Sequence, residues 1–240
     1  MWQTRLTMTN DNQKDVEYIE KRLQSGQNLT FAKTYTKNNV IFSVACAENL
    51  EKNAKKVIEN IARDMILVFY KLRYILHFLN ISKDMNSDMC IFISALLFFD
   101  FESEKDDLGV ILANMQEYSL DGLYYFGIKD IKQNWAEECA MAQDLLSSDF
   151  ERKDLLNISQ FLQSARSKKA SLFLADCDEM LITNATKGGI IEIKQLFNNR
   201  LNNLIGAVIE NSAAEIIMER ANAKKDIVDA LRSFVKVKLL

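Results

Sequence analysis

The sequence predicts an α+β protein that is mostly α-helical, with a small N-terminal β/α region, a helical middle and a small C-terminal α/β element. Long stretches repeat apolar residues at helical spacing, whereas short β-rich runs occur near the two ends of the chain. Hydrophobic residues make up 48% of the 240 residues, enough to bury a sizeable core without disulfides or metal. We expect three consecutive regions: 1–80, 81–167 and 168–240.

The N-terminal region is predicted to contain three strands and two helices. Residues 1–9 partly alternate, and residues 29–36 and 39–46 form two β-rich runs that a tight turn can join as a hairpin. Between the first of these runs and the hairpin, residues 13–24 carry apolar side chains at helical spacing, which predicts a helix. Residues 48–79 predict a long helix, whose apolar second half is expected to be central to the core.

The middle region is predicted to be helical throughout. Polar residues 86–88 can cap a helix over residues 89–99, and two acids at 106–107 predict the start of a helix that runs to about 118. Residues 124–147 and 150–164 are expected to form two further amphipathic helices.

The C-terminal region predicts alternating strands and helices. Residues 170–175 and 180–183 are short β-like runs around a turn at 176–179, and a glycine pair breaks the chain near 188. A helix is expected over residues 195–211. Residues 215–219, 224–234 and 235–240 then predict a strand, a helix and a strand, which favours a parallel pair with a right-handed crossover.

Charge and cysteine content exclude several functional classes. The net charge of −3 and the pI near 5.4 argue against an extended nucleic-acid face, so no nucleic-acid partner is expected. The widely spaced cysteines form no C-x-x-C pair; we expect Cys46, Cys90 and Cys139 to be buried free thiols and Cys177 to be exposed. No secretory signal or membrane span is predicted, and a cytoplasmic location is expected.

The stretch DGLYYFGIKDI at residues 121–131 is the most distinctive motif. Its form, G-x-x-x-F-x-(I/L)-K-D at the start of a helix, resembles the central signature of the YtxC-like family, bacterial proteins associated with sporulation whose biochemical role is unassigned. The resemblance implies a sporulation-associated protein but no chemistry. Gly127 and Ile131 depart from the family pattern, which favours arginine and tyrosine there. The candidate binding residues are Gly122, Tyr124, Tyr125, Phe126, Lys129 and Asp130.

The same residues can also serve as a helix junction without a ligand. Gly122 permits a close approach of the chain before the helix, and Leu123, Phe126 and Ile131 can face the core. Lys129 and Asp130 are polar and can pair with neighbouring helices.

No catalytic residue, metal site or cofactor is predicted. His77, the only histidine, lies in an apolar helix pattern and is expected in the core or an interface rather than in a catalytic relay. The acids at residues 176–179 could offer oxygens to Mg²⁺ or Ca²⁺, but no EF-hand loop follows, which favours a solvated turn.

The leading hypothesis is a non-enzymatic protein that binds a protein partner through the aromatic surface around Tyr124 and Tyr125, which should therefore be exposed. A small-ligand, metal-binding or enzymatic role that uses Asp130, Asp176 and Asp178 is an alternative. A weak nucleic-acid binder is a third. The residues specify neither the partner's identity nor the oligomeric state.

Overall fold

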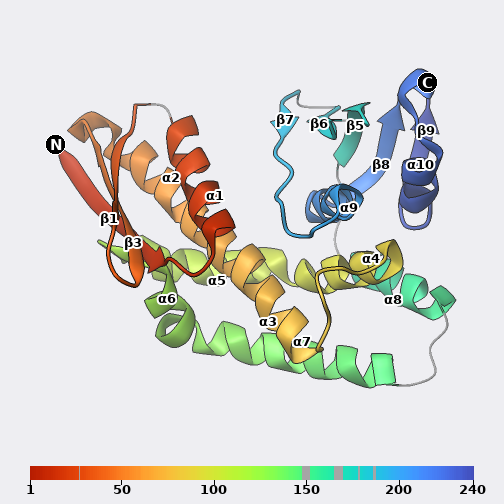
Figure 1. The fold of residues 1–240 in the computed structure, drawn as a ribbon, viewed down its shortest axis with the longest axis horizontal. Helices are drawn as coiled ribbons and strands as arrows, with labels where there is room; N and C mark the ends of the chain where they lie inside the picture. Colours follow the sequence, from red (N-terminus) through yellow and green to blue (C-terminus); the bar gives the residue numbers. More distant parts are fainter. Residues whose placement is uncertain (27, 148–151, 165–169, 178, 186–187) are drawn as a thin grey trace. The chain divides into compact units, whose positions relative to one another are not determined.

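A computed structural model describes residues 1–26, 28–147, 152–164, 170–177, 179–185 and 188–240 (Figure 1). Helices predominate and two sheets accompany them, which confirms the predicted α+β class. The chain forms two compact units, and each unit is built from two segments. Residues 1–74 and 101–137 form the first unit, and residues 75–100 and 138–240 form the second. The three consecutive regions inferred from the sequence stay a prediction.

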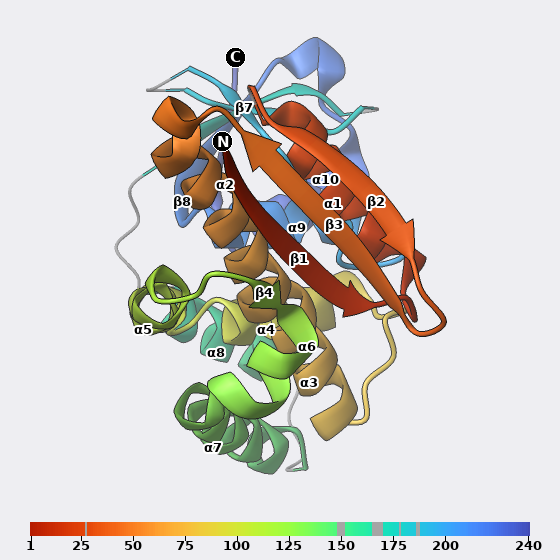
Figure 2. The same ribbon diagram turned by 90° about the vertical axis from the view of Figure 1, so that its left-hand side faces the viewer.

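The sheet of the first unit has the order β2-β3-β1-β4. Its strands are β1 (Trp2–Thr9), β2 (Thr30–Tyr35), β3 (Asn39–Cys46) and β4 (Tyr118–Ser119). β1 pairs antiparallel with β3, which in turn pairs with β2 in the predicted hairpin, while the short β4 lies parallel to β1. Alternate residues of β3 are buried, because α1 (Gln13–Ser25) and α2 (Glu51–Asp64) lie over one face of the sheet (Figure 2).

The predicted helix over 48–79 is confirmed, with one change of geometry in its middle. It begins as a short 3₁₀ turn, η1 (Glu48–Leu50), continues as α2, widens into a π-helical turn, η2 (Met65–Tyr70), and ends as α3 (Lys71–Phe78). All six residues of η2 are buried, so the second half is central to the core, as expected. π-Helical turns inside α-helices often occur at functional sites.

Residues 101–147 differ from the prediction in three ways. α5 (Phe101–Ala113) begins five residues before the predicted start, because Phe101, Glu104 and Leu108 are already buried on one face. It ends at Ala113 rather than near residue 118, where the chain pairs with β1 as the strand β4. Residues 124–147 are not one helix. α6 (Leu120–Gly122) leads into a second π-helical turn, η3 (Leu123–Gly127), and the non-helical backbone of Ile128 separates it from α7 (Lys129–Ser147).

A buried charged group lies in the first unit. The Nζ of Lys71, the first residue of α3, lies 2.5 Å from Oε1 of Glu104 on α5. The same oxygen accepts a hydrogen bond from Nε1 of Trp135 on α7 at 2.7 Å. The Lys71 and Glu104 side chains are almost completely inaccessible to solvent. A buried charge is tolerated only with such partners, so this group links three helical segments.

Tyr118 carries a buried hydroxyl that has no hydrogen-bond partner among the described residues. Burial, with a contribution from the negative charge of Glu59, raises the pKa of Tyr118 to about 12. We expect Tyr118→Phe to raise the free energy of unfolding by about 1 kcal/mol, because the desolvation cost of the hydroxyl disappears. Urea denaturation measures this. Tyr18→Phe is the control: it removes a hydroxyl that donates a hydrogen bond to Asp64 and should lower the free energy of unfolding. A comparable decrease in Tyr118→Phe would contradict the prediction.

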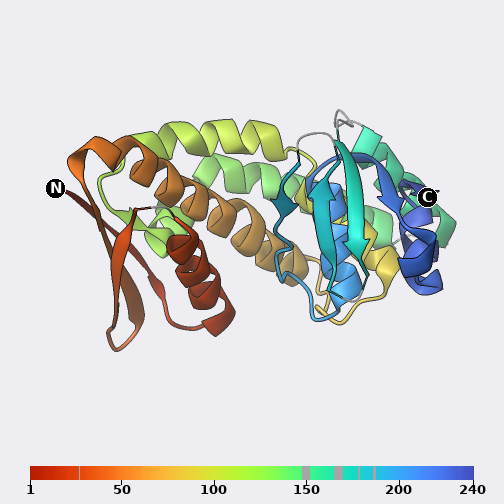
Figure 3. The ribbon, with the colours of Figure 1, turned by 90° about the horizontal axis from the view of Figure 1, so that it is seen from above.

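Among the described residues of the second unit, five strands form a sheet in the order β7-β6-β5-β8-β9 (Figure 3). They are β5 (Ala170–Asp176), β6 (Leu181–Asn184), β7 (Ile190–Ile191), β8 (Ala213–Met218) and β9 (Lys236–Leu239). β8 and β9 are parallel, as predicted for the final strand–helix–strand unit, and α10 (Lys225–Arg232) connects them after a short 3₁₀ turn, η4 (Arg220–Asn222). The two-residue strand β7 was not predicted.

Helices α4 (Ser87–Leu97), α8 (Arg152–Ser164) and α9 (Arg200–Glu210) complete the second unit. Asn86 caps α4 as expected, since its side chain accepts a hydrogen bond from the backbone N–H of Met89 at 2.9 Å. α9 begins later than predicted, at Arg200, where Asn199 caps it. Residues 90–97 of α4 and 202–209 of α9 are all buried, so these two helices provide much of the apolar core.

Buried Asn203 on α9 holds the chain that precedes this helix. Its Oδ1 accepts a hydrogen bond from the backbone N–H of Phe197 at 2.7 Å, and its Nδ2 donates to the Phe197 carbonyl at 3.1 Å. Both residues are buried. Asn203 thus replaces the backbone partners that a regular element would supply.

One expectation about burial is wrong, and a second is wrong in part. Cys177 is buried like the other three cysteines and directly follows the last residue of β5. His77 is exposed and so does not lie in the core. The buried positions of α3 are Lys71, Leu72, Ile75 and Leu76, and this spacing leaves residue 77 on the outer face. The expectation that His77 lies in an interface stays a prediction. Asp178, part of the predicted turn, lies outside the described residues. Among the residues that the structure does describe, no helix combines the length and apolarity needed to cross a membrane.

Candidate functional site

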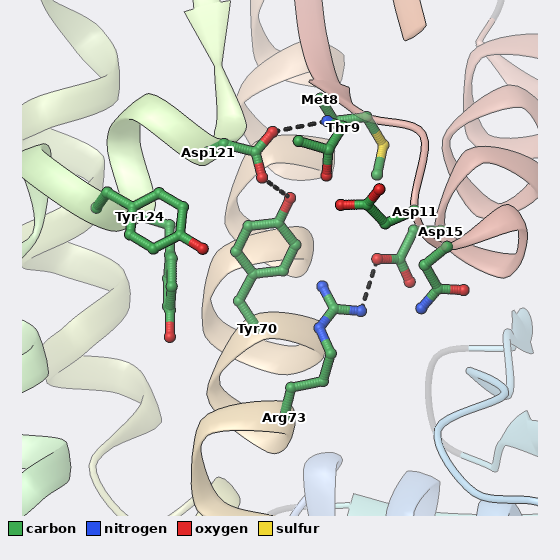
Figure 4. A pocket seen from close by; sticks show the side chains of 10 residues that line it. Met8, Thr9, Asp11, Asp15, Tyr70, Arg73, Asp121 and Tyr124 are labelled. Atoms are coloured by element: carbon green, nitrogen blue, oxygen red, sulfur yellow. Dashed lines mark hydrogen bonds and ion pairs between the residues drawn. The ribbon is translucent and has the colours of Figure 1, made fainter. Parts of the chain in front are cut away.

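A pocket of about 450 Å³ lies in the first unit, where β1 ends (Figure 4). Four short segments line it: the end of β1, the start of α1, the junction of η2 with α3, and the segment from α6 into η3. The lining residues are Met8, Thr9, Asp11, Asn12, Asp15, Tyr70, Arg73, Asp121, Tyr124 and Tyr125. Carboxylates and tyrosines therefore dominate the polar lining.

The start of α1 places Asp11 and Asp15 at the pocket. Asn12 caps the helix, since its side chain accepts a hydrogen bond from the backbone N–H of Lys14 at 3.1 Å. Asp15 then lies in the first helical turn, where a negative charge is favoured by the helix dipole.

Asp121 connects three parts of the pocket wall. Its Oδ2 accepts a hydrogen bond from the backbone N–H of Thr9 at 2.7 Å, and its Oδ1 accepts one from the hydroxyl of Tyr70 at 3.2 Å (Figure 4). Burial, reinforced by the negative charge of Asp121, raises the pKa of Tyr70 well above its usual value. The phenol therefore stays a neutral donor at physiological pH, and neither donor cancels the charge of Asp121.

Arg73 forms the cationic side of the pocket. Its Nη1 lies 2.6 Å from Oδ2 of Asp15, whose side chain is only 2% exposed, and its guanidinium lies 4.5 Å from the ring centre of Tyr70. The guanidinium is thus already engaged by a carboxylate and an aromatic face. Asp11, by contrast, makes no hydrogen bond or ion pair with the described part of the chain, and its side chain is exposed.

A row of aromatic rings leads from the pocket to the surface. Tyr70 and Tyr124 meet edge to face with ring centres 5.1 Å apart, Tyr124 and Tyr125 are again 5.1 Å apart, and Tyr125 and Phe126 are 6.4 Å apart. Exposure increases along the row: Tyr70 is buried, Tyr124 is half-buried, Tyr125 is 60% exposed and Phe126 is 77% exposed. Burial raises the pKa of Tyr124.

The structure brings only some of the predicted site residues together. Tyr124 and Tyr125 line the pocket, whereas Phe126, Lys129 and Asp130 are exposed and lie outside its lining. The expectation that Phe126 faces the core is therefore wrong, while Leu123 and Ile131 are buried as predicted. Gly122 has a steric role, because a Cβ there would lie 2.9 Å from the Ser119 hydroxyl oxygen that accepts its backbone N–H.

Sequence reasoning missed the acids and the cation of the pocket. Tyr70 and Arg73 are three residues apart and share a helix face, which is the only local signal that they could act together. Asp121 lies in the distinctive motif, but it is not among the predicted binding residues. Asp11 and Asp15 flank a helix cap, where acids are common without any ligand.

The acids named in the alternative hypothesis do not meet at the pocket. Among the described residues, no three histidine, cysteine, aspartate or glutamate side chains lie close enough together to hold a metal ion. Asp176 accepts a hydrogen bond from the backbone N–H of Glu179 at 2.9 Å, as in a turn, and neither Asp130 nor Asp176 lines the pocket. The pocket thus combines aromatic rings with carboxylates that are only partly compensated by positive charge.

Comparison with known proteins finds no matching family model, no matching curated protein and no matching solved structure.

Proposed function

We propose that this chain is a non-enzymatic protein-interaction protein, and that its partner contacts the exposed aromatic side chains of Tyr125 and Phe126 beside the pocket. The proposal is supported by the exposure of these two consecutive large aromatic side chains, which are 60% and 77% exposed. Leaving them in water has a free-energy cost that a partner would relieve, and aromatic residues are enriched in protein interfaces and their hot spots.

The local backbone supports this role. Tyr125 and Phe126 lie on the π-helical turn η3. The first residue of this turn, Leu123, is buried, and so is Ile131 after the turn. The exposed rings therefore project from an anchored segment. A surface that is ordered before binding loses less conformational entropy when the partner docks.

The partner is proposed to be a protein rather than a nucleic acid. The net charge is −3, and three aspartates line the adjacent pocket, so a phosphate backbone would be repelled. A sporulation-associated role is part of the same proposal, and it is supported by the residue pattern at 121–131 alone.

Affinity capture from a lysate of the source cells, followed by mass spectrometry, tests the proposal. We expect one stoichiometric protein partner with the wild-type chain. Tyr125→Ala and Phe126→Ala should each reduce its capture at least about tenfold, since interface aromatics commonly contribute 2 kcal/mol or more. The melting temperature should be unchanged, because both side chains are largely exposed.

Val110→Ala is the matched control, because Val110 is also in the first unit, is 69% exposed and lies on α5, away from the pocket. It should leave capture unchanged. Full capture by a Tyr125→Ala/Phe126→Ala double variant would overturn the proposal.

A further inference from the structure

We propose that the pocket binds the positively charged side chain of a lysine or arginine presented by the protein partner. This inference rests on the proposed function, because it takes the cation to be part of the protein partner. It adds the chemistry by which the pocket would recognise that partner. The pocket volume of about 450 Å³ lies within the range of about 300–1,000 Å³ that is usual for ligand sites.

The charges of the lining favour a cation. Asp11, Asp15 and Asp121 supply three negative charges, and Arg73 is the one positively charged residue of the lining. Arg73 is engaged with Asp15, so the charges of Asp11 and Asp121 remain uncompensated. Within the described part of the chain, Asp121 accepts hydrogen bonds only from the neutral N–H of Thr9 and the neutral hydroxyl of Tyr70. This excess of negative charge would repel an anionic ligand and attract a cation.

The aromatic lining adds a second attraction. Cations are stabilised over tyrosine faces by about 0.5–1 kcal/mol at exposed sites. The chain already uses this interaction at the same place: Arg73 lies over the ring of Tyr70, and Lys132 lies 4.3 Å from the ring centre of Tyr124. Tyr125, at the exposed end of the lining, offers a further ring to an incoming alkylammonium or guanidinium group.

The position of the pocket fits one continuous contact. Tyr125 belongs both to the pocket lining and to the exposed pair with Phe126. A partner segment with a basic residue next to an apolar one could place the first in the pocket and the second against Phe126. The cation would supply charge complementarity and the apolar residue would supply buried area.

Small probes test the pocket without the partner. The full chain, labelled with ¹⁵N, is titrated with N-acetyl-arginine methylamide and, separately, with its neutral isostere, N-acetyl-citrulline methylamide. Arginine and citrulline probes have nearly the same shape, so the difference reports the charge. We expect the arginine probe to bind at least about fivefold more tightly, with shifts at Thr9, Tyr124 and Tyr125 and weaker binding at high salt.

Matched variants then locate the charge effect. Asp11→Asn should weaken binding of the arginine probe about two- to fivefold. Asp107→Asn removes the same charge from an exposed position on α5, outside the lining, and should leave binding unchanged. Equal affinity for the arginine and citrulline probes, or equal effects of Asp11→Asn and Asp107→Asn, would overturn the inference. Neither variant is expected to unfold the chain, since both side chains are exposed.

The two proposals fail in different ways. Phe126→Ala should reduce capture of the partner at least about tenfold but leave binding of the arginine probe intact, because Phe126 does not line the pocket. If capture depends on Phe126 while the arginine probe does not bind, the cation site is wrong and the interaction surface stands. If the probe binds but no partner is captured, the protein-interaction role is wrong.

Discussion

A Lys71→Met variant is expected to lose about 3–5 kcal/mol of unfolding free energy, because it leaves the carboxylate of Glu104 buried without its ammonium partner. The Lys71 and Glu104 side chains are 0% and 3% exposed, so water cannot replace the missing charge without local rearrangement. Removing one member of a buried ion pair is among the few single changes that produce losses of this size. Urea denaturation with linear extrapolation measures the loss.

The double variant Lys71→Met/Glu104→Gln separates the charge from the packing. It removes both charges, and the glutamine oxygen can still accept the hydrogen bond from Trp135 Nε1. We expect it to recover most of the lost stability, with a remaining deficit of about 1–2 kcal/mol for the buried amide N–H groups. Lys129→Met makes the same chemical change at an exposed position and should have little effect. A Lys71→Met loss below about 1 kcal/mol would show that the ion pair contributes little.

An Asn203→Leu variant is expected to lose about 2–4 kcal/mol, because it leaves the buried N–H and carbonyl of Phe197 without their side-chain partners. Each unsatisfied buried group costs about 1–3 kcal/mol. Leucine has the same number of side-chain heavy atoms and the same branch point as asparagine, so the variant leaves no cavity. Its two methyl groups are bulkier than the amide, so steric crowding adds to the loss of the hydrogen bonds. The second unit should show the effect in hydrogen exchange, with the largest loss of protection at residues 196–199.

Asn198→Ala is the control for this second prediction. Asn198 is exposed and donates one hydrogen bond to Asp84 at 2.7 Å, so its removal should change stability little. If Asn203→Leu were as stable as Asn198→Ala, the Phe197 backbone groups would have to find other partners in the variant.

Local periodicity predicted most helices and strands, because these elements depend on neighbours within a few positions. It failed where the helical repeat changes. In a continuous α-helix, Phe126 would share a face with Leu123 three residues earlier. The wider π-helical turn and the break at Ile128 remove that relation, so Leu123 is buried and Phe126 is exposed. The sequence carries no evident marker of this turn.

The pocket was predictable only in part, for a different reason. Tyr124 and Tyr125 belong to one distinctive motif, so the sequence pointed to them. The other lining residues, such as Asp11 and Tyr70, come from segments that are far apart in the chain. They meet only through the packing of β1, η2 and η3. Lys71 shows the same limit: its burial depends on Glu104 and Trp135, which no local pattern connects with it.

The interleaved segments of the two units have a consequence for synthesis on the ribosome. Lys71 is synthesised before its partners Glu104 and Trp135. The first unit is complete only when residue 137 has been synthesised, and by then residues 75–100 of the second unit have already been made. At a translation rate of about 5–20 residues per second, roughly 3–13 s pass between the synthesis of Lys71 and that of Trp135. Over that interval the apolar run of η2 has no completed core to enter. Exposed apolar segments of this kind favour aggregation and chaperone binding during synthesis. Any fragment cut between residues 74 and 137 would lack part of the first unit's core.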